Sequence, residues 1–176
     1  VGSLKLNAIS TPVDETFVDQ LRVAAGSRPI LLAASTHSPE EQILLKASQE
    51  VVRAGYPHLL IIAPRHGERS RDIARLMPQA AHRSKNQLPL LGDNHFLADS
   101  FGEMNSLVTA ADIVILGGSF VPKGGHNPLE IAARSTPLIS GPSQFKNKVE
   151  FDTLQQYGQC ITVKDGAALV KQLTIL

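Results

Sequence analysis

The segment GGSFVPKGGHNPLE, residues 117–130, places glycines, prolines and polar side chains between two apolar runs. Its glycines (Gly117, Gly118, Gly124 and Gly125) let the backbone turn through positive φ and approach a ligand closely. The free N–H groups at the start of the helix expected after them favour an anion such as a phosphate. Because a plain connection needs only a few residues, this composition indicates a binding site.

Glu130 is the acidic residue of this segment. A carboxylate repels phosphate, so we expect Glu130 to accept hydrogen bonds from a diol such as that of a ribose. The alternative is a capping box, in which Asn127 caps the helix, Pro128 stands in its first turn and Glu130 reaches back to the Asn127 amide. Capping accounts for these three residues but not for the glycines. Phosphate and ribose together predict a nucleotide.

Two other segments, STHSPEE at 35–41 and APRHGER at 63–69, also follow apolar runs. Arg65 can form a fork of hydrogen bonds to a phosphate, and the alternative is a solvated turn. In the first segment, Ser35 or Ser38 can cap a helix, with the two acids of PEE in its favourable first turn. The position of both segments at expected strand ends favours a binding role.

Three histidines, His37, His66 and His126, fall at expected strand ends, so a three-histidine metal site is an alternative. No Asp or Cys ligands are interleaved with them, and we expect neither a metal nor a cofactor. The first strand is not followed by G-x-G-x-x-G, and the chain has no G-x-x-x-x-G-K-[ST] or G-x-S-x-G. These absences argue against the usual dinucleotide fold, a nucleoside triphosphatase and an α/β-hydrolase.

Apolar runs alternate with helical patterns along the chain, which predicts a doubly wound parallel sheet, an α/β Rossmann-like fold. In such a sheet ligands bind at the carboxyl ends of the strands, where these polar segments fall. Residues 1–10 are interpreted as a linker and residues 11–176 as the domain. Strands are expected over 29–35, 58–63, 88–93, 112–118, 137–140 and 160–163, and helices over 40–53, 69–77, 101–110, 128–134, 145–157 and from 166 onward.

The composition is that of a soluble globular domain, with 43% hydrophobic and 19% charged residues. A net charge of +1 gives no overall electrostatic footprint for nucleic acid. Cys160 is the single cysteine, so a disulfide or a cysteine-based zinc site within the chain is excluded. No apolar run reaches the ~20 residues that span a bilayer, and no secretory signal is present. The chain opens without Met on linker-like residues, so we interpret it as a fragment.

The segments AASTHSPEE, IIAPRHGER, LLGD…FGEM, ADIVILGGSFVPKGGHNPLE and GP…FKN, in this order and spacing, resemble the C-terminal half of the 3-deoxy-D-manno-octulosonic acid (Kdo) transferases. The leading GSLKLN is similar to that family's interdomain N-L-K-F-D segment. The resemblance covers essentially the whole chain, and GGS-x-V-x-x-GGHNPLE is its most specific part. The chain departs from the family pattern with FGEM, PRHGER and NPLEIAA, where M-G-E-L, PRHPER and NPLEPAA are usual.

The resemblance implies one half of a two-domain GT-B glycosyltransferase, the half that binds the nucleotide of CMP-Kdo. The implied enzyme transfers Kdo with inversion to the lipid A precursor, lipid IVA, at the cytoplasmic face of the inner membrane of a Gram-negative bacterium. Its catalytic base lies in the N-terminal domain, so we expect this soluble fragment to be inactive alone. Lys5 matches a lysine that stabilises the transition state. The residues that would contact CMP are Pro64, Arg65, Phe101, Gly102, Glu103, Asn127, Pro128, Leu129 and Glu130.

The implied partners are therefore the CMP-Kdo donor, the lipid acceptor and the N-terminal domain of the same enzyme, without nucleic acid. Two other functions stay open from the residues themselves. One is another GT-B nucleotide-sugar enzyme, an epimerase or a transferase. The other is a stand-alone nucleotide-binding regulatory module.

Overall fold

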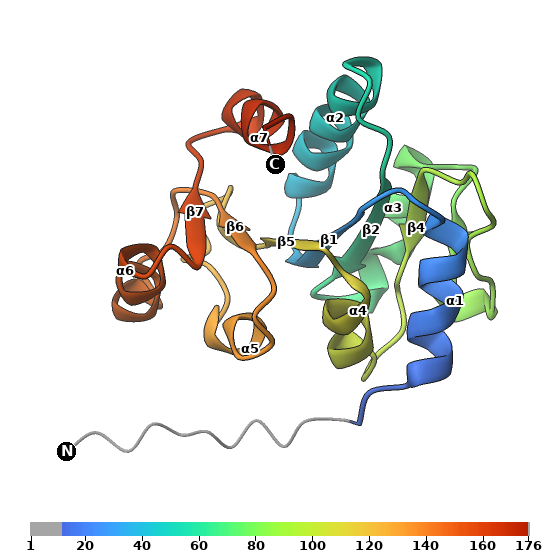
Figure 1. The fold of residues 1–176 in the computed structure, drawn as a ribbon, viewed down its shortest axis with the longest axis horizontal. Coiled ribbons are helices and arrows are strands. Elements are labelled where there is room, and N and C mark those ends of the chain that lie inside the picture. Colours follow the sequence, from blue (N-terminus) through green and yellow to red (C-terminus); the bar gives the residue numbers. More distant parts are fainter. Residues whose placement is uncertain (1–11, 176) are drawn as a thin grey trace.

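The computed structural model describes residues 12–175, which form a seven-stranded parallel sheet with helices on both faces (Figure 1). The strand order is β3-β4-β2-β1-β5-β6-β7. The chain therefore places β2, β3 and β4 on one side of β1, with β4 between β2 and β3, and then adds β5, β6 and β7 on the other side. This arrangement confirms the predicted doubly wound α/β fold. The strands are β1 Ile30–Thr36, β2 Leu59–Pro64, β3 Ala81–His82, β4 His95–Leu97, β5 Ile113–Leu116, β6 Leu138–Ser140 and β7 Cys160–Thr162.

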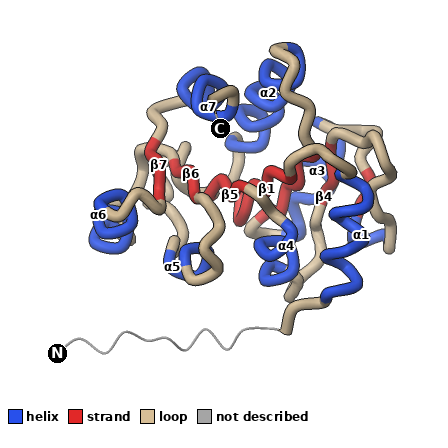
Figure 2. The backbone as a smooth tube through the Cα atoms, in the orientation of Figure 1, coloured by secondary structure: helices blue, strands red, loops and turns tan. Residues whose placement is uncertain are grey.

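Two layers of helices cover the sheet (Figure 2). Helices α1, α4, α5 and α6 contribute to one apolar cluster, and α2, α3 and α7 contribute to the cluster on the opposite face. The helices are α1 Glu15–Ala25, α2 Glu40–Arg53, α3 Ser70–Leu76, α4 Met104–Ala110, α5 Leu129–Ala132, α6 Lys148–Gln156 and α7 Gly166–Leu173, with short 3-10 helices η1 Gly67–Arg69 and η2 Arg83–Lys85.

The central strands supply residues to both clusters. Leu32 and Ala34 of β1 face the layer of α1 and α4, whereas Leu31 and Ala33 face the layer of α2 and α7. A strand that is covered on both faces has no polar face, which is why β1 and β2 read as continuous apolar runs. The rigid centre of the sheet therefore carries the loops that follow β1, β2 and β5.

The prediction of a strand over 88–93 is wrong. Leu90 and Leu91 are 72% and 75% exposed, and the strand of this region is β4, where Phe96 is fully buried. Pro89 lacks the N–H that an interior strand must donate, and Gly92 turns the chain with a φ of +99°. An apolar run was thus mistaken for a buried one.

The sequence analysis also missed α1. Asp14 begins this helix, since its side chain accepts a hydrogen bond from the Phe17 amide at 3.0 Å. Phe17, Leu21 and Ala25 recur at helical spacing and are buried against the sheet. The predicted division at residue 10 and the predicted role of Lys5 lie outside the described residues.

Across residues 12–175, no helix is long and apolar enough to cross a membrane.

Candidate functional site

The loops after β1 and β5 diverge toward opposite faces of the sheet, the first to α2 and the second to α5. The carboxyl ends of these neighbouring strands are therefore the topological switch point, where α/β sheets bind their ligands. A cavity of about 220 Å³ lies there. It is lined by Ala34, Ser35, Arg65, Met104, Asn105, Val108, Leu116, His126, Asn127, Glu130 and Ile131.

Arg65, Asn127 and Glu130, which were predicted from separate segments, thus line one cavity. The Arg65 backbone is held by its amide, which donates to the Thr36 carbonyl at 3.1 Å and joins the end of β2 to that of β1. The side chains of Arg65 and Glu130 are exposed, and neither forms an ion pair with another described residue. A guanidinium and a carboxylate on one cavity wall suit a ligand that carries both an anion and hydroxyl groups.

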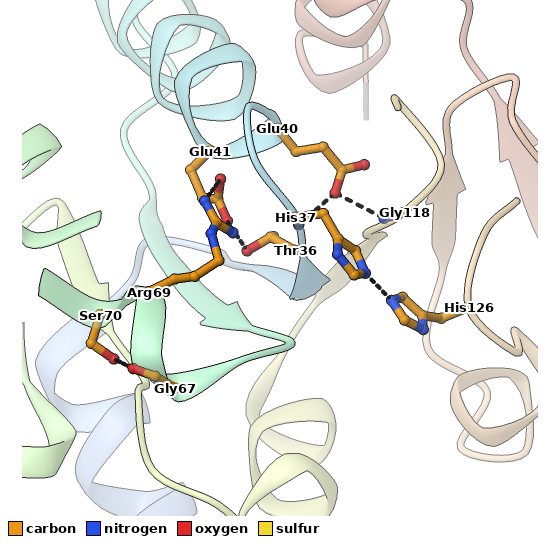
Figure 3. A network of polar contacts seen from close by, with 9 residues as sticks. All are labelled: Thr36, His37, Glu40, Glu41, Gly67, Arg69, Ser70, Gly118 and His126. Carbon is orange, nitrogen blue, oxygen red and sulfur yellow. Dashed lines mark hydrogen bonds and ion pairs between the residues drawn. The ribbon is translucent and has the colours of Figure 1, made fainter. Parts of the chain in front are cut away.

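Residues 117–125, which follow β5, form the glycine loop. At Gly117 this loop approaches the loop after β1 so closely that no side chain would fit. A Cβ on Gly117 would lie 2.3 Å from the Ser35 carbonyl oxygen, and Gly118 has a φ of +68°. The amides of Gly118, Ser119 and Phe120 all donate to the carboxylate of Glu40, which is fully buried at the start of α2. The loop is therefore anchored by an acidic side chain of the protein itself (Figure 3).

Glu41, the next residue of α2, anchors the loop after β2 (Figure 3). Its carboxylate accepts from Arg69 Nη1 at 2.6 Å and Nη2 at 3.0 Å, and from Thr36 Oγ1 at 2.7 Å. Burial by itself raises the pKa of Glu41, but the hydrogen bonds from Arg69 and Thr36 outweigh it and hold the pKa below the ordinary value. This charged pair fixes η1 against the start of α2.

The predicted histidines do come together. His37 Nε2 and His126 Nε2 are 2.9 Å apart and their rings are stacked, while the His66 ring meets that of His37 edge-on. Burial and the neighbouring His126 lower the pKa of His37 to about 4, and burial followed by the Arg65 charge lowers the pKa of His126. In this contact one ring nitrogen donates and the other accepts, and the lowered pKa values of both histidines favour the neutral pair near pH 7.

The metal alternative finds no support in this geometry. Within residues 12–175, no group of three or more His, Cys, Asp or Glu side chains is placed to hold a metal ion. The Nε2 atoms of His37 and His126 are instead engaged with each other.

The remaining predicted residues surround the cavity without lining it. The Glu103 carboxylate accepts hydrogen bonds from Arg83 Nη2 at 2.6 Å and from the Ser100 hydroxyl. Phe101 is 80% exposed, and a Cβ on Gly67 would lie 3.0 Å from its ring. Gly102 turns with a φ of +80°, Pro64 ends β2, and Pro128 and Leu129 begin α5. Contacts between CMP and any of these residues stay predictions.

The start of α5 is only partly the expected capping box. Asn127 Oδ1 accepts from the Leu129 amide at 3.0 Å. In the described chain, Glu130 makes no hydrogen bond back to the Asn127 amide. Glu130 is instead one of the residues that line the cavity.

The sequence analysis placed Glu40 and Glu41 only in the favourable first turn of a helix. It did not predict that their carboxylates hold the two neighbouring loops. Their partners are separated from them by up to 80 residues, so no local spacing reveals the contacts. It also missed the apolar wall of the cavity, formed by Met104, Val108 and Ile131.

The fold is that of a GT-B glycosyltransferase domain. The structure superposes on the C-terminal domain of a glycosyl transferase group 1 family protein (LpcC) from Francisella tularensis with a TM-score of 0.54 and 15% identity, over 95% of this chain and 85% of that one. This likeness shows the fold alone. No protein-family model matches the chain.

The particular relatives are 3-deoxy-D-manno-octulosonic acid transferases. The chain is 32% identical to that of Rickettsia conorii over 180 residues, which cover 100% of this chain and 39% of the relative. It is 42% identical to that of Haemophilus influenzae over 134 residues, which cover 73% of this chain and 31% of the relative. The structure also matches the crystal structure of the C-terminal CMP-Kdo binding domain of WaaA from Acinetobacter baumannii, with a TM-score of 0.81 and 27% identity over 92% of this chain and 89% of that domain.

The chain is therefore homologous over its whole length to the Kdo transferases and matches their C-terminal domain, which confirms the resemblance seen in the motifs. It spans about two fifths of the length of the curated relatives that it matches along its whole length.

Proposed function

We propose that the chain is the donor-binding half of a Kdo transferase and that the cavity at the switch point takes the CMP part of CMP-Kdo. The observation that carries this proposal is the presence of Arg65 and Glu130 on one cavity wall. A nucleoside monophosphate offers a phosphate to the first and a ribose diol to the second. The homology to Kdo transferases supports cytidine and Kdo, which the residues alone do not specify.

The size of the cavity supports a site that is completed by another domain. Its volume of about 220 Å³ is below the ~300–1,000 Å³ of most sites for small molecules. CMP-Kdo bound with its CMP part in this cavity would leave the Kdo outside, in the space where the N-terminal half of a GT-B enzyme would close. Phe101 and Glu103, which precede the lining residue Met104 in the chain, would then lie between the donor and that half.

The mechanism that we propose is an inverting transfer. A base in the N-terminal domain takes the proton of an acceptor hydroxyl on lipid IVA. That oxygen bonds to the anomeric carbon of Kdo while the bond from this carbon to the phosphate oxygen breaks, and CMP leaves with the electron pair. Arg65 would stabilise the charge that develops on the leaving phosphate, assisted by Lys5. The whole enzyme would act at the cytoplasmic face of the inner membrane.

A thermal-shift series with CMP, UMP, UDP and AMP tests the nucleotide. A ligand that binds only the folded state stabilises it in proportion to the logarithm of its concentration over its Kd. CMP should therefore give the largest increase in Tm. A larger increase with UDP would favour another GT-B nucleotide-sugar enzyme, and a larger increase with AMP would favour a regulatory module.

A complementation experiment tests the two-domain mechanism. The purified chain is incubated with CMP-Kdo and acceptor lipid, and the separately expressed N-terminal half of the parent enzyme is then added. General base catalysis contributes ~10²–10⁴-fold, and positioning of the acceptor contributes more, so the chain alone should not transfer Kdo. Transfer by the chain alone would contradict the proposed division, whereas activity that appears only with the added half would support it.

A further inference from the structure

The carboxylate of Glu40 occupies a concave nest of backbone amides. Its Oε1 accepts from Ser119 N at 3.0 Å and Phe120 N at 2.9 Å, and its Oε2 accepts from Gly118 N and His37 N, both at 2.8 Å. Successive amides that converge in this way form a typical anion site of phosphate-binding loops. Here the anion belongs to the protein.

This internal anion is completely enclosed, since Glu40 is 0% exposed. A buried carboxylate is stable only when its oxygens are satisfied, and each oxygen here receives two N–H donors. A ligand phosphate cannot enter the same amides, because it would meet both the carboxylate and its charge. The glycines were predicted to let the backbone approach a ligand closely, but between Gly118 and Phe120 the backbone amides are closed to a phosphate.

The nest is connected to the cavity by the backbone. Gly118 O accepts from Gly125 N at 2.8 Å, and Gly117 O accepts from His126 N at 3.4 Å. An added Cβ at Gly118 would lie 3.4 Å from the His126 ring, so the loop and this ring are in direct contact. His126 and the three residues that follow it lead directly into Glu130. The position of one cavity wall is therefore set from Glu40.

We propose that Glu40 is a positioning residue of the donor site, an internal anion that holds the glycine loop and directs the donor phosphate away from the nest and toward Arg65. This inference rests on the proposed function, because it concerns the same cavity. Glu40 does not touch the ligand. It acts through Gly118 on the stretch from Gly125 to Glu130.

The test compares Glu40→Gln with Asp112→Asn. In Glu40→Gln the amide –NH₂ must face two N–H donors, which displaces the loop. Asp112→Asn is the matched control at the opposite ends of the strands, where the carboxylate accepts from the Ile30 amide at 2.8 Å. Both changes should lower Tm. Only Glu40→Gln should weaken CMP binding, by about tenfold or more, since misplacement by ~1 Å can cost ~100-fold.

Glu40→Ala gives a second readout that a purely structural role would not produce. Formate is small enough to replace the lost carboxylate in the nest. Added formate should restore CMP affinity to Glu40→Ala and leave the wild-type chain and Asp112→Asn unchanged. Equal CMP affinity in Glu40→Gln and the wild type, with no effect of formate, would overturn the inference.

Amide NMR of the wild-type chain tests the same point without any variant. On addition of CMP, the amide resonances of Gly118, Ser119 and Phe120 should move little, whereas Arg65 Nε–H should move strongly. Large shifts confined to the three nest amides would place the phosphate there and refute the inference. Failure of the wild-type chain to bind CMP at all would instead defeat the proposed function, and the inference with it.

Discussion

The two ends of the central strands each carry a cavity, and the larger one is not the one to which we assign the nucleotide. At the amino ends of β1 and β5, a cavity of about 570 Å³ is walled by apolar groups such as Leu31, Val51 and Ile113. The cavity at the carboxyl ends has about 220 Å³ but carries Arg65 and Glu130. Charged residues line both cavities, since Arg28 and Asp112 belong to the larger one, so the comparison depends on whether those charges already have partners in the protein.

The two ends use their buried or paired acidic residues in a similar way. At the amino ends, Asp112 accepts a hydrogen bond from the Ile30 amide and forms an ion pair with Arg22. Its charge is therefore already paired within the protein, where it holds the start of β1. At the carboxyl ends, the carboxylates of Glu40 and Glu41 also have partners within the protein. Glu40 accepts from the loop after β5, and Glu41 accepts from Arg69 in the loop after β2. Anchored loops present further charges in fixed positions, as binding sites require. The larger cavity also carries a cation and an acid, Arg28 and Asp112, but both are already engaged within the protein. At the carboxyl ends, Arg65 and Glu130 line the cavity and form no ion pair with another described residue.

Arg65→Ala should have the largest effect on CMP binding. A hydrogen bond to a charged group contributes ~1.5–3 kcal/mol, so the loss of a fork of two, ~3 kcal/mol or more, should weaken CMP binding by at least about 100-fold. Cytidine, which lacks the phosphate, should bind the variant and the wild type with nearly equal, low affinity. Isothermal titration with both ligands measures this. Equal losses for CMP and cytidine would place Arg65 against the base or the ribose.

Glu130→Gln should have the next largest effect. The change removes the charge of the acceptor but not its shape, and the loss of ~1.5–3 kcal/mol corresponds to CMP binding that is about ten- to hundredfold weaker. The 2′-deoxy form of CMP should lose much less on this substitution than CMP itself, because it lacks one hydroxyl of the diol. If Glu130 serves only α5, the variant would show a lower Tm and an unchanged CMP affinity below melting.

The charged residues of the cavity could be predicted from the sequence because the fold places them by rule. Once β1, β2 and β5 were recognised as buried strands, their carboxyl ends had to meet, and Arg65 and Glu130 with them. Glu40 could not be assigned in this way, since an acid in the first turn of a helix is already explained by the helix dipole. Its partners at 118–120 are reached only through the packed sheet.

The fold itself was predicted where burial is complete and misread where it is one-sided. β1 and β2 are covered on both faces and read as apolar runs, whereas the run that contains Leu90 and Leu91 lies on the surface. Hydropathy along the sequence does not distinguish a buried apolar run from an exposed one, because it does not show what packs against the run. α1 shows the converse, since its charged outer face concealed a stripe through Phe17 and Leu21 that is fully buried.

A fall in pH should lower the stability of the fold to a moderate degree, through the histidines at the carboxyl ends of the strands. Burial and then the His126 charge lower the pKa of His37 to about 4, with His66, Lys123 and Arg69 acting in the same direction. Between that pH and the ordinary value near 6.5, the unfolded chain binds more protons than the folded one, so stability falls as the pH is lowered through this window.

Thermal melts of the wild-type chain and His37→Gln between pH 7 and pH 4 measure this effect, and the variant should show the shallower fall in Tm. Part of the slope should remain, because burial also lowers the pKa of His58 at the amino ends. Identical slopes would show that the pair of His37 and His126 does not resist protonation in the fold.

The smallest effect on CMP should come from His58→Ala, which changes the larger cavity. His58 is buried at the amino ends, where its Nε2 lies 2.7 Å from Ser48 Oγ and its Nδ1 lies 3.0 Å from the Tyr56 carbonyl oxygen. Its removal leaves both groups without this partner, which costs ~1–3 kcal/mol. For a chain of this size each kcal/mol lowers Tm by about 2–4 °C, so the melt should shift clearly. CMP affinity measured below melting should stay at the wild-type value, because no residue of the 220 Å³ cavity is touched. A loss of CMP affinity comparable to that of Glu130→Gln would move the nucleotide to the amino ends and reverse the assignment of the two cavities.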